Sequence, residues 1–170
     1  MKNHLFLIAG MALLFLVTSC RKTDVQSETS LNKETTVPSS LKTQEWKSVT
    51  NWTSAKGEKF ITYTAYITDS TITSTVAKNG LVLAFVKNGA SINAMPYQEK
   101  TTSDSYWHYQ VAEGVIIFSV DAYSPVELRS PELKYFVLAQ DQIKHLETAG
   151  YSKTHLMQLT YEEAEELLNK

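Results

Sequence analysis

Residues 105–120 read SYWHYQVAEGVIIFSV, and this stretch decides the fold class. Its first part alternates, so that Trp107 and Tyr109 fall on one face of an extended chain and Tyr106 and His108 on the other. A Glu-Gly pair supplies a turn, and a continuous apolar run follows. We therefore predict two antiparallel strands, the first with Trp107 and Tyr109 in the core and the second apolar on both faces.

Similar patterns lie on either side of this stretch. Residues 81–86 are apolar on both faces, which predicts a second central strand, and Asn-Gly pairs at 79–80 and 88–89 predict turns. Residues 68–77 predict one helical turn over the edge of the domain. We expect an all-β fold, an antiparallel β-sandwich of about six to eight strands, with a small β-barrel as the alternative. Further strand patterns occupy residues 60–67, 92–97 and 133–139.

Short helices are predicted after the last strand. Residues 141–149 end at a glycine and suit a short helix. Thr160 and Glu163 have the spacing of a capping box, which predicts a second helix from there onward and places His155 in the loop between the helices. The acids Glu162, Glu163, Glu165 and Glu166 are expected to form a solvated helix face.

The first twenty residues predict export and a lipid anchor. Residues 5–17 carry no charge, and a helix of this length reaches only about 20 Å, less than the ~30 Å core of a bilayer. They fit the apolar region of a secretory signal. The following residues, Val17-Thr18-Ser19-Cys20, end in the only cysteine of the chain. They resemble the lipobox of bacterial lipoproteins; the alternative is an ordinary secretory signal that contains a cysteine.

The lipobox resemblance implies a domain organisation and a location. Residues 1–19 would be a signal that is cleaved off, and Cys20 would carry the acyl chains that bind the membrane. Residues 20–45 would hold this lipidated cysteine and a flexible tether, because Ser and Thr dominate there and few residues are apolar. Residues 46–170 would form the sandwich domain with its helical segment. Arg21 favours the outer membrane of the cell envelope, with the periplasmic and surface faces both open.

A second resemblance covers the middle of the chain. Trp46 and Trp52 lead in, the pair Asn79-Gly80 precedes an apolar strand, and Pro96 follows the next strand. In these features the chain resembles small, uncharacterised β-sandwich lipoproteins of Bacteroidota. This resemblance implies a β-sandwich fold and a lipid anchor, and it supplies no site residues. Asp69-Ser70-Thr71 also resembles the O-glycosylation motif of exported Bacteroidota proteins, which implies Ser70 as an acceptor.

Composition excludes several classes of function. Sixteen basic residues against eighteen acidic ones leave no basic field, so we expect no nucleic-acid partner. The chain has one cysteine and no pair of histidines at metal-ligand spacing, so we expect no metal site. It also has no glycine-rich phosphate-binding loop, so we expect no cofactor. The chain also lacks the Gly-x-Ser-x-Gly pattern of serine hydrolases, and we assign no catalytic residue.

Aromatic residues give the best functional candidates. We predict that Tyr97, Tyr106 and His108 lie on a polar strand face and form a platform for a sugar ring or a peptide. The alternative is that these rings merely cover a half-wet sheet. The expected function is therefore a non-enzymatic binding or structural module for an envelope protein or glycan. The alternative function is a small envelope hydrolase with a carboxylate pair on the sandwich loops, for which the candidates are Asp104, Glu113, Asp121 and Glu127.

Overall fold

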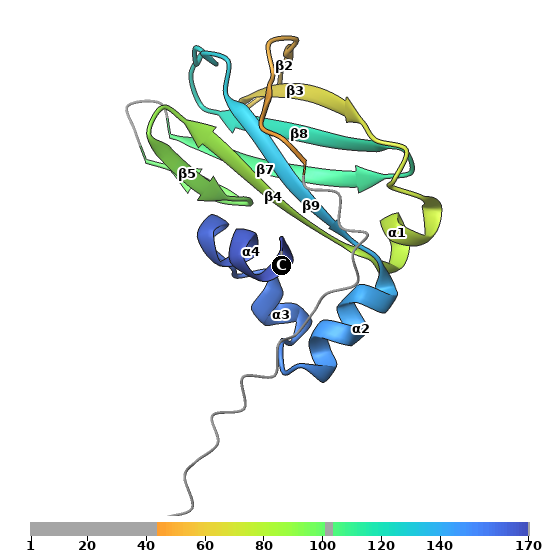
Figure 1. The fold of residues 1–170 in the computed structure, drawn as a ribbon. Helices are drawn as coiled ribbons and strands as arrows, with labels where there is room; N and C mark the ends of the chain where they lie inside the picture. The colour runs from red at the N-terminus through yellow and green to blue at the C-terminus, as the bar shows by residue number, and fades with distance from the viewer. Residues whose placement is uncertain (1–43, 101–103, 170) are drawn as a thin grey trace, which may run out of the picture. The chain divides into compact units, whose positions relative to one another are not determined.

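The computed structural model describes residues 44–100 and 104–169, which belong to one compact unit of the chain. Within these residues the fold comprises nine strands and four short helices (Figure 1). The strands are β1 Lys47–Ser48, β2 Thr53–Lys56, β3 Ile61–Thr68, β4 Leu81–Asn88, β5 Ser91–Ala94, β6 Tyr97–Glu99, β7 Ser105–Ala112, β8 Val115–Ala122 and β9 Glu132–Leu138. The helices are α1 Ser74–Asn79, α2 Gln140–Thr148, α3 Lys153–Leu156 and α4 Tyr161–Leu168.

The strands form two antiparallel sheets, which confirms the predicted sandwich. One sheet has the order β1-β9-β4-β5 and the other has the order β2-β3-β8-β7-β6. Neither sheet closes on itself within the described residues, so the barrel alternative is wrong. The predicted hairpin is present, because β7 pairs with β8 from Ser105 opposite Ala122 to Ala112 opposite Val115.

The prediction of one strand over residues 92–97 is wrong. β5 belongs to the four-stranded sheet, where it pairs with β4, and β6 belongs to the five-stranded sheet, where it pairs with β7. The chain passes from one sheet to the other at Met95-Pro96, a cis peptide bond. Proline has no N–H to donate to a ladder, so a strand is readily interrupted at this position.

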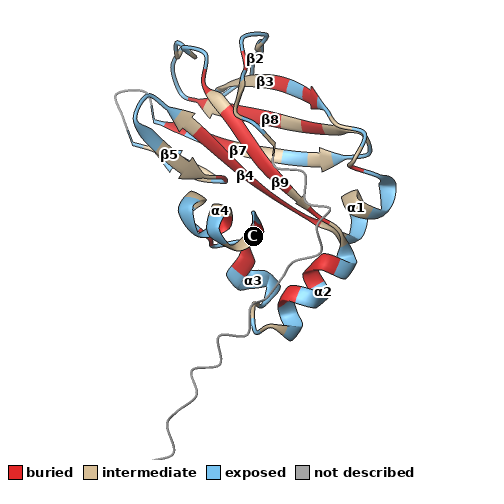
Figure 2. Cartoon of the chain, in the orientation of Figure 1, coloured by how far each residue is buried: buried red, intermediate tan, exposed pale blue. Residues whose placement is uncertain are grey.

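The four-stranded sheet is covered on both faces. Val82, Ala84 and Val86 of β4 face the other sheet, within the core between the two sheets. Leu81, Leu83 and Phe85 face the opposite way, into a second core that they share with α2, α3 and α4. This confirms β4 as a strand that is apolar on both faces, and Figure 2 shows it buried along most of its length.

β8 is the second predicted strand that is apolar on both faces, but only one of its faces is buried. Ile116, Phe118 and Val120 are buried between the sheets, whereas Val115 and Ile117 point outward and stay partly exposed. Ile117 is flanked across the ladders by Tyr66 and Gln110 rather than covered by another layer. The predicted strand is therefore confirmed and is central in its sheet, although its outward apolar side chains stay partly exposed.

The helices follow the predictions in outline. α1 begins after the cap residue Thr73 and confirms the predicted helical turn. α4 has the predicted capping box, in which Glu163 N–H donates to Thr160 Oγ1 and Thr160 N–H donates to Glu163 Oε2. The predicted loop around His155 instead contains the short helix α3, whose cap is Ser152.

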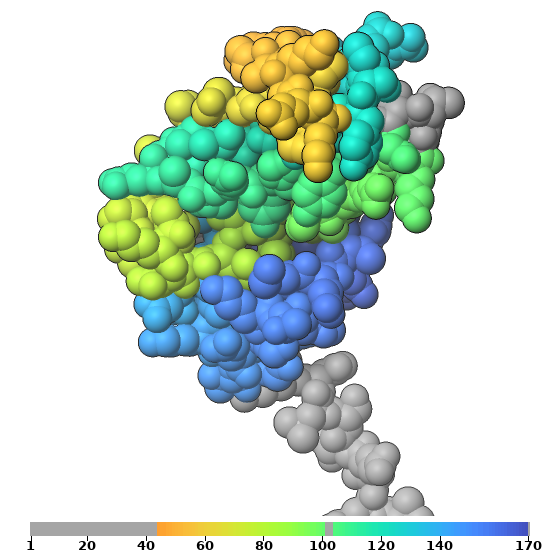
Figure 3. Space-filling view, turned by 180° about the vertical axis from the view of Figure 1, so that it is seen from behind, coloured from red at the N-terminus to blue at the C-terminus, as the bar shows by residue number. Residues whose placement is uncertain are grey.

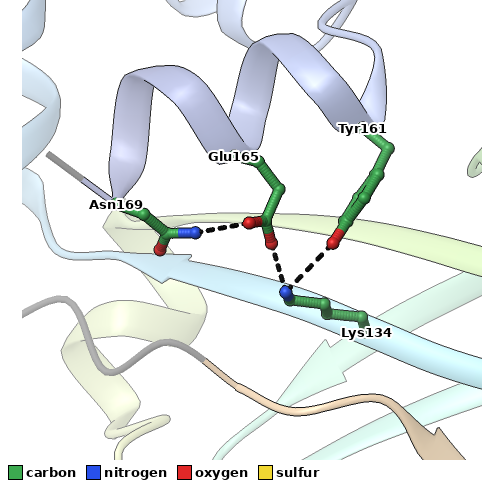
Figure 4. A network of polar contacts seen from close by, with 4 residues as sticks. All are labelled: Lys134, Tyr161, Glu165 and Asn169. Atoms are coloured by element: carbon green, nitrogen blue, oxygen red, sulfur yellow. Dashed lines mark hydrogen bonds and ion pairs between the residues drawn. The ribbon is translucent and has the colours of Figure 1, made fainter.

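A buried lysine fixes α4 to the four-stranded sheet (Figure 4). Lys134 of β9, whose side chain is 7% exposed, donates to Glu165 and, over 3.2 Å, to Tyr161 Oη. Asn169 Nδ2 donates to the other carboxylate oxygen of Glu165 over 2.8 Å. Glu165 therefore does not belong to a solvated acidic face, as the sequence suggested, but neutralises a cation beneath the helix.

Candidate functional site

The outer face of the five-stranded sheet is not covered by helices α2–α4. Helices α2–α4 pack on the other sheet, and Figure 3 shows the teal surface of β7 and β8 beyond the blue helices. We call this outer surface the open face. It consists of Thr53 and Ala55 of β2, Thr62, Thr64, Tyr66 and Thr68 of β3, Gln98 of β6, Tyr106, His108, Gln110 and Ala112 of β7, and Val115, Ile117, Ser119 and Asp121 of β8.

A polar cluster lies at one end of the open face. The register places Thr62 opposite Asp121 and Asp121 opposite Tyr106 in one row across three strands. Thr62 Oγ1 donates to Asp121 Oδ1 over 2.6 Å, and His108 Nε2 lies 3.2 Å from Asp121 Oδ2. The Tyr106 ring stacks on the His108 ring with 5.3 Å between centroids. The sheet thus holds an imidazole and a carboxylate in fixed positions beside an exposed phenol.

Exposed aromatic side chains concentrate on this sheet. Tyr66 and Tyr106 lie on the open face, Phe60 directly precedes β3, and Tyr123 directly follows β8. Because Ile61 pairs with Ala122, Phe60 and Tyr123 leave the sheet at the same end. These four side chains are 42–73% exposed, and the only other large hydrophobic side chain exposed among the described residues is Met157 of the helical layer.

The open face carries little charge. Asp121 and His108 are its only residues with a carboxyl, imidazole or basic group, and they contact each other. The remaining groups are hydroxyls, amides, methyl groups and aromatic rings. Such a surface offers hydrogen bonds and ring stacking to a neutral ligand and no electrostatic attraction to a polyanion.

Tyr97 does not join Tyr106 and His108, so the predicted platform of three residues is wrong at this position. Tyr97 pairs with Trp107 and therefore points to the inner side of the sheet. Its ring stacks on Trp107 with 6.0 Å between centroids, and its hydroxyl is buried without a hydrogen-bond partner in the described structure. Burial, aided by the charge of Glu99, raises the pKa of Tyr97. Trp107 and Tyr109 lie in or against the core, as predicted.

Ser70 lies in an exposed turn whose neighbour is well anchored. Asp69 accepts hydrogen bonds from the backbone and hydroxyl of Thr71 and from Tyr135 Oη, over 2.7–2.9 Å. Burial acts to raise the pKa of Asp69, but these hydrogen bonds outweigh it and lower the pKa. The Ser70 side chain is exposed, and its glycosylation stays a prediction. Cys20, with the rest of the signal and tether, lies outside the described residues.

The four candidate carboxylates of a hydrolase do not gather at one place. Asp121 pairs with Tyr106, whereas Glu113 follows Ala112 at the far end of the hairpin, about 20 Å along the strand. Glu127 accepts from Arg129 Nε and Nη2 at 3.0 Å. Asp104, which directly precedes β7, and Glu127, which lines the same recess as Ser105, both lie at the sheet end of Asp121. In the described part of the chain, no three His, Cys, Asp or Glu side chains converge as metal ligands would.

Sequence reasoning missed Thr62 as a partner of the site and treated Asp121 only as a candidate acid. Strand alternation places Asp121 on the same face as Ile117 and Ser119, but only the pairing of β8 with β3 and β7 brings it to Thr62 and His108.

Comparison with protein-family models, with curated proteins and with solved structures gives no match to this chain. None of the helices within residues 44–100 and 104–169 combines the length and hydropathy needed to cross a membrane.

Proposed function

We propose that this chain is a lipid-anchored, non-enzymatic binding module of the cell envelope, and that its open face binds a neutral glycan. The anchoring part rests on the lipobox-like residues that end in Cys20. The binding part rests on one observation: of the five large hydrophobic side chains exposed among the described residues, four lie on or beside the open face, around a polar cluster of fixed geometry.

The chemistry of the open face suits a sugar chain. A tyrosine ring presents a flat apolar face to the C–H groups of a sugar, and nearby polar groups can hydrogen-bond its hydroxyls. Around Tyr106 these groups are Asp121, His108 and, one strand further, Gln98. Outside the aromatic rings the surface is largely Thr, Ser and Gln, whereas the core of a protein interface is more apolar.

The spacing of the rings suits an extended ligand. Tyr66 on β3 and Tyr106 on β7 are two strands apart, and Tyr66 lies in the row of Gln110, four residues beyond Tyr106. With strands about 4.8 Å apart and a rise of about 3.4 Å per residue, the two positions are about 17 Å apart. A short oligosaccharide can therefore lie diagonally across the sheet and contact both rings.

Binding is tested with the full, lipidated chain in detergent. The probes are a β-glucan, an α-mannan and a galactan, each measured by retardation in affinity electrophoresis. If one of them binds, Tyr106→Ala should weaken it about tenfold, equivalent to about 1.4 kcal/mol. Met157→Ala removes an even more exposed side chain from the helical layer and should leave binding unchanged.

Two results contradict the glycan assignment. One is equal retardation of wild type and the Tyr106→Ala variant; the other is capture of a protein partner through Tyr66 and Tyr106 with no retardation by any polysaccharide. The anchor has a separate test. Cys20→Ala should move the protein out of the membrane fraction and abolish labelling by an alkynyl fatty acid, whereas the control Thr23→Ala should change neither.

A further inference from the structure

A recess lies at one end of the sandwich, on the opposite side of β7 from the open face. It has a volume of about 200 Å³. Its floor is formed by Ser105 and Trp107 of β7, both buried, and Glu99 of β6 stands beside them. Its rim comes from the loop between β8 and β9, including Pro125, Pro131 and Arg129, with Asn88 of β4. We call it the Glu99 pocket.

The Glu99 carboxylate is held through one of its oxygens. Trp107 Nε1 donates to Glu99 Oε2 over 3.3 Å and to Ser105 Oγ over 3.2 Å. Ser105 Oγ donates to the same Glu99 Oε2 over 3.4 Å. The buried indole and hydroxyl thus fix the carboxylate, while no described group donates to Glu99 Oε1.

Among the described residues, no cation pairs with this carboxylate. Four ion pairs form among the described residues, and none includes Glu99. Arg129, the one basic side chain of the lining, is held by Glu127 through both Nε and Nη2. Apart from Glu99 and the Glu127–Arg129 pair, the lining carries no charge, so Glu99 lies among neutral polar and apolar groups. These are Asn88, Ser105, Trp107, Val126, Leu128 and two prolines. An acidic group in such a place attracts a single positive charge carried on a neutral or apolar stem.

Size and geometry narrow the ligand further. Pockets for drug-sized molecules have volumes of about 300–1,000 Å³. The Glu99 pocket is smaller and therefore suits one side chain or one small ring. A guanidinium group prefers to bind both oxygens of a carboxylate, whereas an ammonium group is a compact point charge. Glu99 Oε2 already accepts two hydrogen bonds, so a bidentate guanidinium would compete for that oxygen, whereas an ammonium group can bind through Oε1 alone.

We propose that the Glu99 pocket binds a primary ammonium group, which Glu99 pairs and Trp107 and Ser105 help to position. Two sources carry this chemistry, a lysine side chain of a protein and an amino sugar. The proposal does not rest on glycan binding at the open face, because Tyr106 alternates with Ser105 and Trp107 and points to the other side of the sheet.

The test follows the indole N–H signal of Trp107 in ¹⁵N-labelled full chain, assigned by elimination with Trp46→Phe and Trp52→Phe. The probes are Nα-acetyl-lysine amide and glucosamine. Their matched controls without the charge are Nε-acetylated lysine amide and N-acetylglucosamine. We expect a saturable shift with at least one amine and none with its acetylated form. Preference for one amine over the other distinguishes the two sources.

A variant then locates the binding. Glu99→Gln keeps an acceptor for Trp107 and Ser105 but removes the charge, and should weaken amine binding at least tenfold. Glu166 lines a separate recess of the helical layer, so Glu166→Gln should have no effect on amine binding. The proposal is overturned if neither amine shifts the signal up to about 10 mM, ten times a Kd of 1 mM. It is also overturned if the acetylated forms bind equally or if Glu166→Gln alone abolishes binding. We expect polysaccharides to retard the Glu99→Gln variant as much as wild type. Failure of amine binding can therefore be distinguished from failure of glycan binding.

Discussion

Removing Glu165 should destabilise the domain far more than removing its partner Lys134. The two residues form an ion pair between α4 and β9, but their surroundings differ, since the side chain of Lys134 is 7% exposed and that of Glu165 is 30% exposed. Glu165→Ala leaves an ammonium group buried with only the Tyr161 hydroxyl as an acceptor. Lys134→Met leaves a carboxylate that water reaches and that Asn169 still binds.

The magnitudes follow from this asymmetry. Breaking a buried ion pair from one side costs about 3–5 kcal/mol when the remaining charge has no compensation. Tyr161 and water entering through the partly exposed site of Glu165 offset part of this, so we expect Glu165→Ala to cost about 2–3 kcal/mol. Methionine keeps most of the lysine stem in place, and we expect Lys134→Met to cost less than about 1 kcal/mol. In the double variant the second substitution should add little, because the buried charge is gone.

Urea unfolding followed by tryptophan fluorescence measures these differences. Trp46 is a suitable reporter of α4, because its ring lies 5.2 Å from that of Tyr161. Glu162→Ala, an exposed acid on the same helix, is the matched control and should stay within about 0.5 kcal/mol of wild type. Equal losses for Glu165→Ala and Lys134→Met, or a Glu165→Ala variant as stable as the control, would refute the reasoning.

Three further predictions concern the same domain. The advantage of wild type over a Lys134→Met/Glu165→Gln double variant should be complete between pH 4.5 and pH 10.5 in urea titrations. Burial opposes both charges, but the mutual hydrogen bonds and charge of the pair outweigh it, so the pKa of Glu165 is lowered below its ordinary 4.5 and that of Lys134 is raised above 10.5. The advantage is therefore lost as pH falls through the lowered pKa of Glu165 or rises through the raised pKa of Lys134. Gly80→Ala should cost about 2 kcal/mol or more by the same method, because the new Cβ would lie 2.6 Å from the carbonyl oxygen of Val76 and 2.7 Å from that of Leu138; an unchanged midpoint would contradict this packing. Tyr97→Phe removes a buried hydroxyl that has no hydrogen-bond partner among the described residues. It should leave the urea midpoint unchanged or raise the free energy of unfolding by up to about 1 kcal/mol, and a clear decrease would show that the hydroxyl is hydrogen-bonded.

The fold was largely predictable because the strongest sequence patterns are local. Alternation over 105–111 and the two-sided apolar run over 81–86 define two strands, and the sheets that contain them follow. The interpretation failed where pairing with distant residues decides the outcome. Residues 92–97 have one continuous strand pattern, yet their two halves join different sheets.

The candidate site was predictable only in part for the same reason. Tyr106 and His108 are two residues apart on one strand, so alternation alone places them together. Tyr97 comes from another strand, and its face depends on its pairing with Trp107. Lys134 gave an unused indication, because a lysine inside an apolar strand is rarely buried without a partner. The identity of that partner, 31 residues further along the chain, could not be read from the strand.

The contrast between β4 and β7 explains why the site lies where it does. β4 is apolar on both faces, and the helices that follow β9 supply the second layer that its outward side chains require. β7 alternates, so its outward side chains are polar or aromatic and need no second layer. A sheet built from such strands can leave one face to water, provided its exposed groups are satisfied, as Thr62, Asp121 and His108 are by one another. Exposed tyrosines are not required by that arrangement, because threonine or glutamine would keep the face solvated equally well. The exposure of Tyr66 and Tyr106 on the open face, with Tyr123 beside it, is therefore the feature that folding leaves unexplained and that ligand binding would explain.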